Sequence, residues 1–177
     1  MATAFPTYCP TCGTSLDRRE IEGRIRAYCP TCEQPNYRNP KPCAGVLVIE
    51  DDQVLLVKRS IPPASGSWSV PAGYLEHDEP PEVAATRELA EETGLTVPAD
   101  AIELFDTAFI EHPDGTYVLV LLYTVSRDRT TGEPTPGSDA AAARFWQLEL
   151  LAERGETLEP GYRELFSRAI HSLDQSS

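Results

Sequence analysis

The stretch that most constrains this chain runs from Gly73 to Leu95, GYLEHDEPPEVAATRELAEETGL. Proline occurs in it only at Pro80 and Pro81, where the first turn of a helix does not need the missing N–H. Asp78 is predicted to be the N-cap, and Gly94 is predicted to end the helix in a left-handed conformation. The stretch therefore predicts one helix that begins near Pro81 and ends before Gly94. Its predicted apolar face consists of Val83, Ala84, Leu89 and Ala90.

Three carboxylates gather on one side of this predicted helix. Glu88 and Glu92 are four residues apart, which places their Cβ atoms about 6 Å apart, and Glu91 borders the same side. Like charges at this spacing repel, and Arg87 offers only one positive charge to offset them. A divalent cation offers more, and clustered hard oxygen ligands suit Mg²⁺ or Mn²⁺. A solvated acidic helix face is the alternative interpretation of a glutamate pair taken alone.

The complete spacing of this stretch matches a known signature. It reads Gly73, five residues, Glu79, seven residues, and then Arg87-Glu-Leu-x-Glu-Glu-x-Gly-Leu. This agrees with the Nudix box at every defined position, and the chain resembles the Nudix hydrolases over about residues 41–173. The resemblance implies metal-dependent cleavage of a diphosphate linked to another moiety. It also implies an α+β fold, the Nudix α/β/α sandwich with a mixed β-sheet.

The resemblance assigns roles to the residues of the box. Glu88 and Glu92 correspond to metal-binding glutamates, and Glu91 corresponds to a third ligand or a helper. The carbonyl of Gly73 corresponds to a further ligand. Attack of water on phosphorus needs charge neutralisation and a positioned water, and metal ions supply both.

Two supporting roles also follow from the resemblance. Arg87 and Glu79 correspond to a pair that steadies the loop against the helix. Relatives that cleave dinucleotides often carry an acidic residue in the loop before the last strand, and Asp139 is the candidate here, seven residues before Trp146. In resembling sequences a second acid follows three residues later, whereas this chain has Ala142.

The N-terminal part of the chain carries a second metal pattern. The spacing C-x2-C-x16-C-x2-C predicts one tetrahedral zinc site in a zinc ribbon of residues 1–36. Two disulfides, a redox pair or iron bound by the same thiolates are the alternatives. So short a segment cannot bury a core, so metal binding would supply its folding energy. Four thiolates leave no open position, which indicates structural Zn²⁺. The ligands are Cys9, Cys12, Cys29 and Cys32.

The remaining chain is predicted as a linker, residues 37–42, and a Nudix domain, residues 43–177. Prolines keep the linker extended. Cys43 is predicted to be a small buried residue. The run YVLVLLYTV is almost entirely apolar and predicts a central strand. The predicted strands are 24–28, 44–50, 54–59, 68–73, 102–111, 116–126 and 143–148, and the predicted closing helix is 162–173.

The charge of the chain limits its partners. A formal net charge of −13 argues against nonspecific binding of nucleic acid or of an anionic membrane by the whole surface. No run approaches the ~18 apolar residues of a membrane helix, and the N-terminus lacks a basic segment followed by an apolar one. We therefore expect a cytoplasmic protein without a membrane partner. A diphosphate substrate is anionic too, so a metal ion must reverse the local field.

The expected substrate is a small nucleoside diphosphate derivative. Arg59, Lys41, Phe109 and Tyr117 are candidate substrate contacts, and a structural role is the alternative for each. The form Ala-Gly-Tyr-Leu-Glu resembles the ribbon-bearing Nudix subgroup, which includes NADH, ADP-ribose and FAD pyrophosphatases. The NADH enzymes carry Ser-Gln-Pro-Trp shortly after the box, whereas this chain has LTVPA at residues 95–99. ADP-ribose or FAD is therefore expected over NADH.

The role of the ribbon leaves alternatives open. Packing on the Nudix domain and holding a homodimer together are favoured, and contact with nucleic acid is the alternative. An RNA-end processing enzyme that grips RNA with the ribbon, and a nucleotide-sensing regulator without catalysis, are the competing functions. Salt-dependent RNA binding and phosphate release would separate them. The ribbon and linker are locally basic through Arg18, Arg19, Arg24, Arg26 and Arg38.

Overall fold

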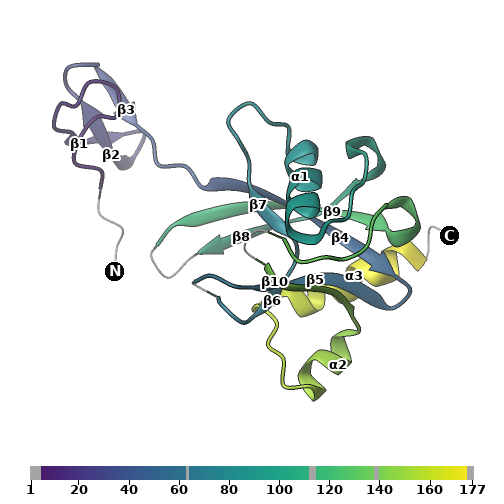
Figure 1. Cartoon of the computed structure of the whole chain (residues 1–177). Coiled ribbons are helices and arrows are strands. Elements are labelled where there is room, and N and C mark those ends of the chain that lie inside the picture. Colours follow the sequence, from purple (N-terminus) through teal and green to yellow (C-terminus); the bar gives the residue numbers. More distant parts are fainter. Residues whose placement is uncertain (1–4, 63, 112–114, 138–139, 175–177) are drawn as a thin grey trace. The chain divides into compact units, whose positions relative to one another are not determined.

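The computed structural model describes residues 5–62, 64–111, 115–137 and 140–174 (Figure 1). It divides the chain into two compact units, which are described separately. The first unit comprises Met1–Lys41 and Ile110–Val118. The second unit comprises Pro42–Phe109 and Leu119–Ser177.

The N-terminal part of the first unit is a three-stranded antiparallel sheet. Its strands are β1 (Asp17–Ile21), β2 (Arg24–Cys29) and β3 (Gln34–Asn36), in the order β1-β2-β3. Glu22 and Gly23 join β1 to β2 with φ angles of 53° and 72°, as a tight two-residue hairpin turn requires. The strand predicted for residues 24–28 is confirmed, whereas its two neighbours carry no comparable alternation and were not predicted.

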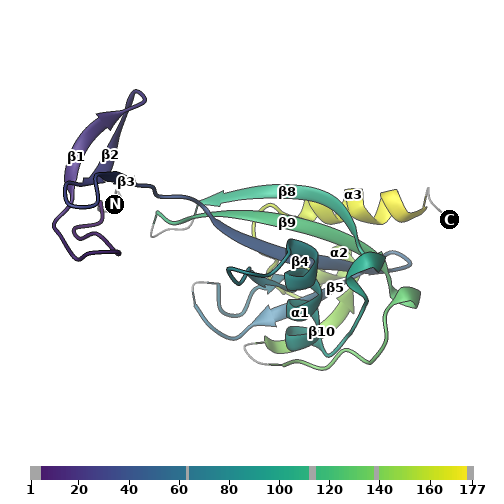
Figure 2. The same ribbon diagram turned by 90° about the horizontal axis from the view of Figure 1, so that it is seen from above.

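The second unit is built on a larger sheet with the strand order β10-β5-β4-β9-β8. Two short strands extend it, because β6 pairs with β5 and β7 pairs with β4. β4 and β5 are antiparallel, whereas Figures 1 and 2 show β4 and β9 side by side and running in the same direction, so the sheet is mixed. The apolar run predicted to be a central strand is β9. The bounds are β4 (Lys41–Glu50), β5 (Gln53–Arg59), β6 (Trp68–Ser69), β7 (Ala72–Tyr74), β8 (Glu103–Glu111), β9 (Tyr117–Ser126) and β10 (Ala140–Trp146).

Helices cover both faces of this sheet (Figure 2). They are α1 (Pro81–Thr93), α2 (Leu148–Glu153) and α3 (Tyr162–Asp174), with short 3-10 turns at Ala99–Ala101 and Arg127–Arg129. No helix in the described part of the chain has the length and hydropathy needed to span a bilayer.

Successive side chains of β4 show how the layers pack. Val46 and Val48 belong to one buried cluster with Leu89 of α1. Leu47 lies between them in sequence and is also fully buried, but outside that cluster, as expected for a strand with both faces covered. Phe166 of α3 has no exposed surface either. The α+β sandwich expected from the Nudix resemblance is thus confirmed.

The helix predicted after the box glycine is confirmed, with two corrections. Gly94 ends it with φ 72° and donates its N–H to the carbonyl of Ala90. The N-cap is Pro80, not Asp78, because the chain stays extended up to Pro80 and no side chain caps the first turn. Val83 was predicted to be buried but is 41% exposed.

The apolar face of α1 is displaced relative to the prediction. Ala84, Ala85 and Leu89 are fully buried, and Ala90 is only partly buried. Because α1 packs on the sheet through the face that carries Leu89, the residues that share this face are the buried ones. Small side chains at Ala84 and Ala85 let the helix approach closely, which favours them over the more hydrophobic Val83.

Two predicted strands also differ from the structure. The segment 68–73 is broken between β6 and β7 at Pro71, which cannot donate to a ladder but accepts a hydrogen bond from Val46 N at 3.2 Å. The strand predicted for 143–148 spans Ala140–Trp146 instead, and α2 follows at once from Leu148. The closing helix is confirmed as α3.

The docking of α1 on the sheet predicts a large stability difference between two truncations. Leu89→Ala should lower the free energy of unfolding by about 2–5 kcal/mol, because it leaves a cavity in the core. Val83→Ala on the exposed side should change it by less than about 0.5 kcal/mol. Urea unfolding of both variants measures this, and equal midpoints would contradict the described packing of α1.

Candidate active site

Arg87 is the hub of the acidic helix. Its Nε and Nη2 donate to Glu79 Oε1 and Oε2 at 2.9 and 2.8 Å, which makes a bidentate pair. Nη2 also donates to the carbonyl of Tyr74 at 3.1 Å. Nη1 donates to Glu88 Oε1 at 2.6 Å and to Glu91 Oε2 at 3.3 Å. One guanidinium thereby joins the end of β7, the loop before the helix and two helical carboxylates.

The charges of this hub support one another. The hydrogen bonds from Arg87 hold the pKa of Glu79 below its usual value, although partial burial opposes this. The hydrogen bond with Glu79 raises the pKa of Arg87 in turn, and Glu88 adds to the effect. Both groups therefore stay charged at neutral pH, and the loop stays bound to the helix.

Glu88 and Glu92 face the strand that precedes the helix. Glu92 is only 8% exposed, and its Oε2 accepts a hydrogen bond from the backbone N–H of Ala72 at 3.1 Å. The Glu88 carboxylate lies against Gly73, where a Cβ would overlap its oxygens. Sterics therefore explain why the box has glycine at this position, because any side chain on residue 73 would displace the Glu88 carboxylate.

A buried thiol lies within reach of the same two carboxylates. Cys43 on β4 pairs with Tyr74 of β7 and is 9% exposed, as predicted. Burial raises the pKa of Cys43 to about 12, and the charges of Glu88 and Glu92 contribute to the shift. The thiol thus stays protonated beside the acidic cluster.

The three helical glutamates differ in their surroundings. Glu92 is buried, Glu88 is partly buried and Glu91 is exposed. Within the described part of the chain, their carboxylates do not form a group of three oxygens at metal-ligand spacing. In this structure Arg87 supplies the positive charge that Glu88 and Glu91 share. Their roles as ligands, and that of the Gly73 carbonyl, stay predictions.

The loop that precedes β10 closes the C-terminal end of α1. Thr135 N donates to the carbonyl of Thr93 at 2.7 Å, and Gly137 N donates to the carbonyl of Glu92 at 3.1 Å. A Cβ at Gly137 would overlap the carbonyl of Glu91. These contacts satisfy carbonyls that a helix end leaves unpaired. Asp139, the predicted source of catalytic help, follows this loop and lies outside the described residues.

The four predicted substrate contacts are divided between the two units. Arg59 and Phe109 belong to the second unit, and Lys41 and Tyr117 to the first. Arg59 Nε lies 3.6 Å from Glu159 Oε1. Phe109 is 64% and Tyr117 is 41% exposed, and Lys41 is exposed as well. Their contact with substrate stays a prediction.

Tyr162, at the start of α3, is a neighbour of the site that the sequence did not indicate. Burial raises the pKa of its hydroxyl, with further contributions from Glu159, Cys43 and Glu92. The residue is partly exposed, but its ring stacks on Phe166 at 5.2 Å between centroids. It follows Gly161 without any motif, so only the fold brings it near Glu92.

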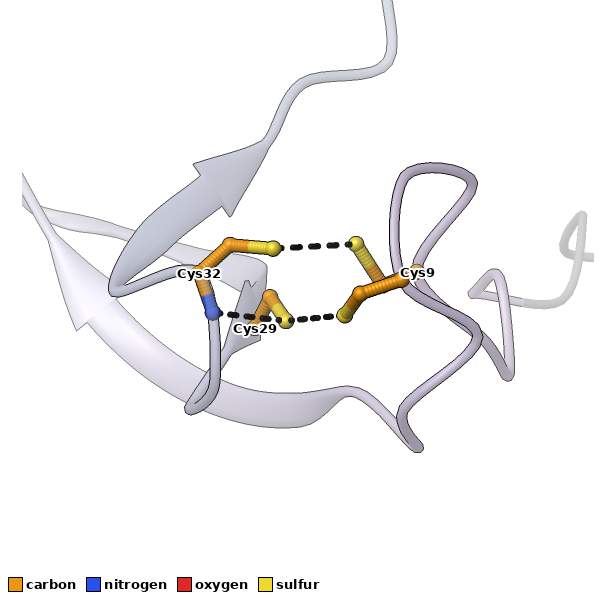
Figure 3. A group of neighbouring side chains, drawn as sticks. Cys9, Cys29 and Cys32 are labelled. Atoms are coloured by element: carbon orange, nitrogen blue, oxygen red, sulfur yellow. Dashed lines mark hydrogen bonds between the residues drawn. The ribbon is translucent and has the colours of Figure 1, made fainter.

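The four N-terminal cysteines form a compact cluster (Figure 3). Cys9 and Cys32 have their Sγ atoms 4.0 Å apart, Cys12 and Cys29 have theirs 3.5 Å apart, and all four lie within 4.8 Å of one another. Tetrahedral zinc with Zn–S bonds of about 2.3 Å requires S–S separations of about 3.8 Å. A disulfide would need about 2.05 Å, so the described geometry disagrees with two disulfides.

The thiols are also set in a polar environment. Hydrogen bonds from Thr14 lower the pKa of Cys12 to about 6. The backbone N–H of Cys32 donates to Cys29 Sγ at 3.3 Å. Hydrogen bonds with Cys12 and Cys29, in contrast, raise the pKa of Cys32 to about 12, because neighbouring thiols share their protons when no metal ion is bound. Amides and hydroxyls directed at sulfur stabilise thiolates, which is the form that binds a metal ion. The cluster therefore fits a structural zinc site.

Comparison with known proteins assigns the chain to a family. The family model described as NUDIX domain matches residues 39–169. An ADP-ribose pyrophosphatase from Methanocaldococcus jannaschii is 30% identical over 115 residues, which cover 65% of this chain and 66% of that protein. The NAD-capped RNA hydrolase NudC from Stutzerimonas stutzeri is 37% identical over 90 residues, which cover 51% of this chain and 32% of the relative. The aligned part thus spans less than two thirds of either relative.

The structural comparison agrees with this assignment. The crystal structure of a NUDIX hydrolase from Nitrosomonas europaea matches with a TM-score of 0.63 and 25% identity, and the match covers 87% of this chain and 85% of that one. The family model spans most of the chain, including α1 and its box. The chain therefore belongs to the Nudix hydrolase family.

Proposed function

We propose that the protein is a metal-dependent pyrophosphatase that hydrolyses the diphosphate of a nucleoside diphosphate derivative. The observation that carries this proposal is the seating of two carboxylates of α1 on β7, Glu92 on the Ala72 N–H and Glu88 against Gly73. A buried carboxylate is costly unless its charge is used or compensated. Glu92 is such a buried carboxylate, and Glu88 and Glu91 of the same helix lie next to it, so a bound cation would compensate the charge of all three.

The donor set fits a hard divalent cation. Glu88, Glu91 and Glu92 supply carboxylate oxygens, and the Gly73 carbonyl is a further neutral oxygen, which is the ligand type that Mg²⁺ and Mn²⁺ prefer. A cation bound there offsets the charge of the diphosphate and activates water for attack on phosphorus. The side chains must be aimed beforehand, and the two backbone contacts with β7 aim Glu88 and Glu92.

The other residues of the site have supporting tasks in this proposal. Arg87 positions the loop and the helix through Glu79 and does not contact substrate. Arg59 is proposed to contact a phosphate oxygen, because its guanidinium extends from β5 and is paired with Glu159 only at 3.6 Å. Asp139 is proposed, from the sequence alone, to help orient or deprotonate the attacking water.

The favoured substrates are ADP-ribose and FAD, ahead of NADH. The proposal rests on the segment after the box, where the NADH pyrophosphatases carry Ser-Gln-Pro-Trp. In this chain Leu95 is fully buried and Val97 is 8% exposed, so both side chains belong to the core. Thr96 between them is bound to Thr131. This segment therefore offers few side chains for holding a second nucleotide.

The zinc proposed for the cysteine cluster has a structural task. The three strands of the ribbon supply few buried side chains apart from the cysteines, with Ala27 at 3% exposure as one of them. A metal bound by four thiolates would supply the missing folding energy. We further propose that the ribbon holds two copies of the chain together.

A second candidate function is processing of RNA ends. Arginines of the ribbon lie over aromatic rings of the ribbon and linker, with Arg19 3.8 Å from the Tyr28 centroid and Arg26 4.8 Å from the Tyr37 centroid. Stacked arginine and aromatic pairs can bind single-stranded bases. One relative is named as an NAD-capped RNA hydrolase. RNA binding by the chain that weakens steeply with salt would support this candidate.

The proposed role of α1 predicts a separation of activity from stability. Glu92→Gln should lower turnover at saturating Mg²⁺ by about 10²-fold or more, because several kcal/mol of metal-dependent stabilisation are lost and each 1.36 kcal/mol is a factor of ten. Gln keeps the volume and helix propensity, and less repulsion with Glu88 should hold or raise the melting temperature without metal. Glu88→Gln should behave alike, and Glu91→Gln should be milder.

Glu82→Gln is the matched control, because Glu82 lies in the first turn of the same helix, away from the Arg87 hub. Turnover is measured beside melting curves with and without Mg²⁺. Near-normal turnover by a folded Glu92→Gln protein would mean that α1 is an acidic surface and not the active site.

The cysteine cluster predicts a fixed metal content. Purified protein should contain about one zinc per chain, and Cys29→Ser should lose it and unfold the ribbon while leaving the Nudix turnover measurable. Cys43→Ser, which changes a thiol outside the cluster, should keep the zinc. Elemental analysis and thiol titration measure both. Four readily alkylated thiols in native protein free of metal would overturn the assignment.

The substrate order is tested with a panel of nucleotide diphosphates in Mg²⁺, with products separated by chromatography. ADP-ribose and FAD should show higher kcat/KM than NADH, and each cleavage should release two phosphate-bearing products. Faster turnover of NADH under matched conditions would overturn the substrate proposal but leave the pyrophosphatase proposal intact.

A further inference from the structure

A polar cavity lies at the β10 edge of the sheet, between that strand and α2. It has a volume of about 210 Å³, and its lining includes Arg144, Trp146 and Arg154, together with Gln53 and Gln147. None of these residues belongs to the acidic helix or to the loop that closes it. The cavity is therefore separate from the active site.

Two arginines that line this cavity, Arg144 and Arg154, both contact the indole ring of Trp146. The guanidinium carbons of Arg144 and Arg154 lie 5.7 and 5.5 Å from the Trp146 ring centroid, and Arg144 also lies 5.5 Å from that of Trp68. These cation–π contacts fix the two cations without using their N–H groups. Among the residues that the structure describes, neither guanidinium forms a salt bridge or donates a side-chain hydrogen bond, although the charge of Arg144 contributes to lowering the pKa of Glu156. This is unusual in a chain with 28 acidic and 15 basic residues.

The indole that the two guanidiniums share is buried. Trp146 is only 5% exposed, and its Nε1 has no hydrogen-bond partner among the described residues. The neighbouring Trp68, by contrast, donates its Nε1–H to Glu156 at 2.9 Å. A buried N–H without an acceptor is uncommon and destabilising. Because this N–H has almost no accessible surface, it does not contribute a donor to the cavity.

The two carboxylates near the cavity accept hydrogen bonds from other donors and not from Arg144 or Arg154. Glu156 accepts from Lys58 Nζ at 2.7 Å as well as from Trp68, and these bonds lower the pKa of Glu156. Asp52 accepts from Gln147 Nε2 at 2.7 Å. Both acids near the cavity thus have donors of their own. The guanidiniums of Arg144 and Arg154 remain without an acceptor in hydrogen-bond contact among the described residues.

We propose that this cavity binds the phosphate group of a small molecule. A phosphate monoester carries nearly two negative charges at neutral pH, which two guanidiniums offset, and its oxygens accept hydrogen bonds from several directions. The cavity is smaller than the roughly 300–1,000 Å³ of sites that enclose a drug-sized ligand. It therefore suits free phosphate or a phosphate on a small carrier such as a pentose, and not a dinucleotide.

The chain contains two tryptophans, of which Trp146 lines this cavity and Trp68 packs against Trp146 at 5.3 Å between ring centroids, so intrinsic fluorescence reports on the cavity. The full-length protein is titrated with inorganic phosphate, and separately with ribose 5-phosphate, at constant ionic strength. Divalent cations are left out, so that the acidic helix has no cation through which to hold a phosphate. Each titration is repeated with Arg144→Gln and with Arg154→Gln.

Arg168→Gln is the matched control. It removes another exposed arginine that lies over an aromatic ring, Phe105 at 5.4 Å, in a different part of the domain. The expected result is a saturable change for the native protein and the control, with Kd raised tenfold or more in both test variants. Tighter binding of ribose 5-phosphate identifies a sugar phosphate as the source, and equal or weaker binding identifies free phosphate. Either order supports the site.

Three results would overturn the proposal. They are the absence of a saturable response in the native protein, an equal response to chloride at the same ionic strength, and binding that both arginine variants retain. None of these results depends on turnover, so the outcome is independent of the proposed pyrophosphatase activity.

Discussion

The fold around the active site depends on how one guanidinium is shared. Arg87 is bound from four sides, by both oxygens of Glu79, the Tyr74 carbonyl and two helical carboxylates. A helix with three glutamates within five residues would be strained by repulsion if it stood alone. The Arg87 guanidinium offsets the negative charge of the glutamates. The same side chain also binds the loop and the strand that precede the helix, so it holds these elements together.

Close packing of backbone completes this attachment. Gly73 leaves room for the Glu88 carboxylate, and Ala72 offers its N–H to Glu92. Ala72 and Pro71 also lie close to Gly45 of β4. A Cβ atom on Gly45 would be 2.6 Å from the Pro71 carbonyl oxygen. Gly45 therefore lets β4 and the chain at Pro71 and Ala72 lie close together, and Gly73 lets β7 approach the acidic helix.

The sequence predicts the parts of this arrangement that rest on local chemistry and fixed spacing. The helix, its end at Gly94 and the four-cysteine cluster are such parts, and they match the structure. The predictions that failed concern which residues tertiary packing buries. Val83 is more hydrophobic than Ala85, yet the closeness of the sheet favours the smaller residue in the core.

Other features left no readable pattern in the sequence. A helix of six residues such as α2 is too short to show a helical period. Tyr162 comes near Glu92 only because α3 folds back across the sheet, and the Ala72 contact uses a backbone group that any residue except proline carries. By contrast, Arg144 and Trp146 stand two residues apart on one strand, so their shared face could have been read from the sequence.

The loop from Thr130 to Gly137 has a consequence for how this family member can change. Its N–H groups at Thr135 and Gly137 are fastened to the last carbonyls of the acidic helix, and Arg127 binds the carbonyl of Gly132 at 2.8 Å. An insertion or deletion inside this loop would pull on the turn that carries Glu92. Loops are usually where a scaffold gains new specificities by changing length. Between Thr130 and Gly137 that freedom is limited, because a change in length there would disturb the end of the acidic helix.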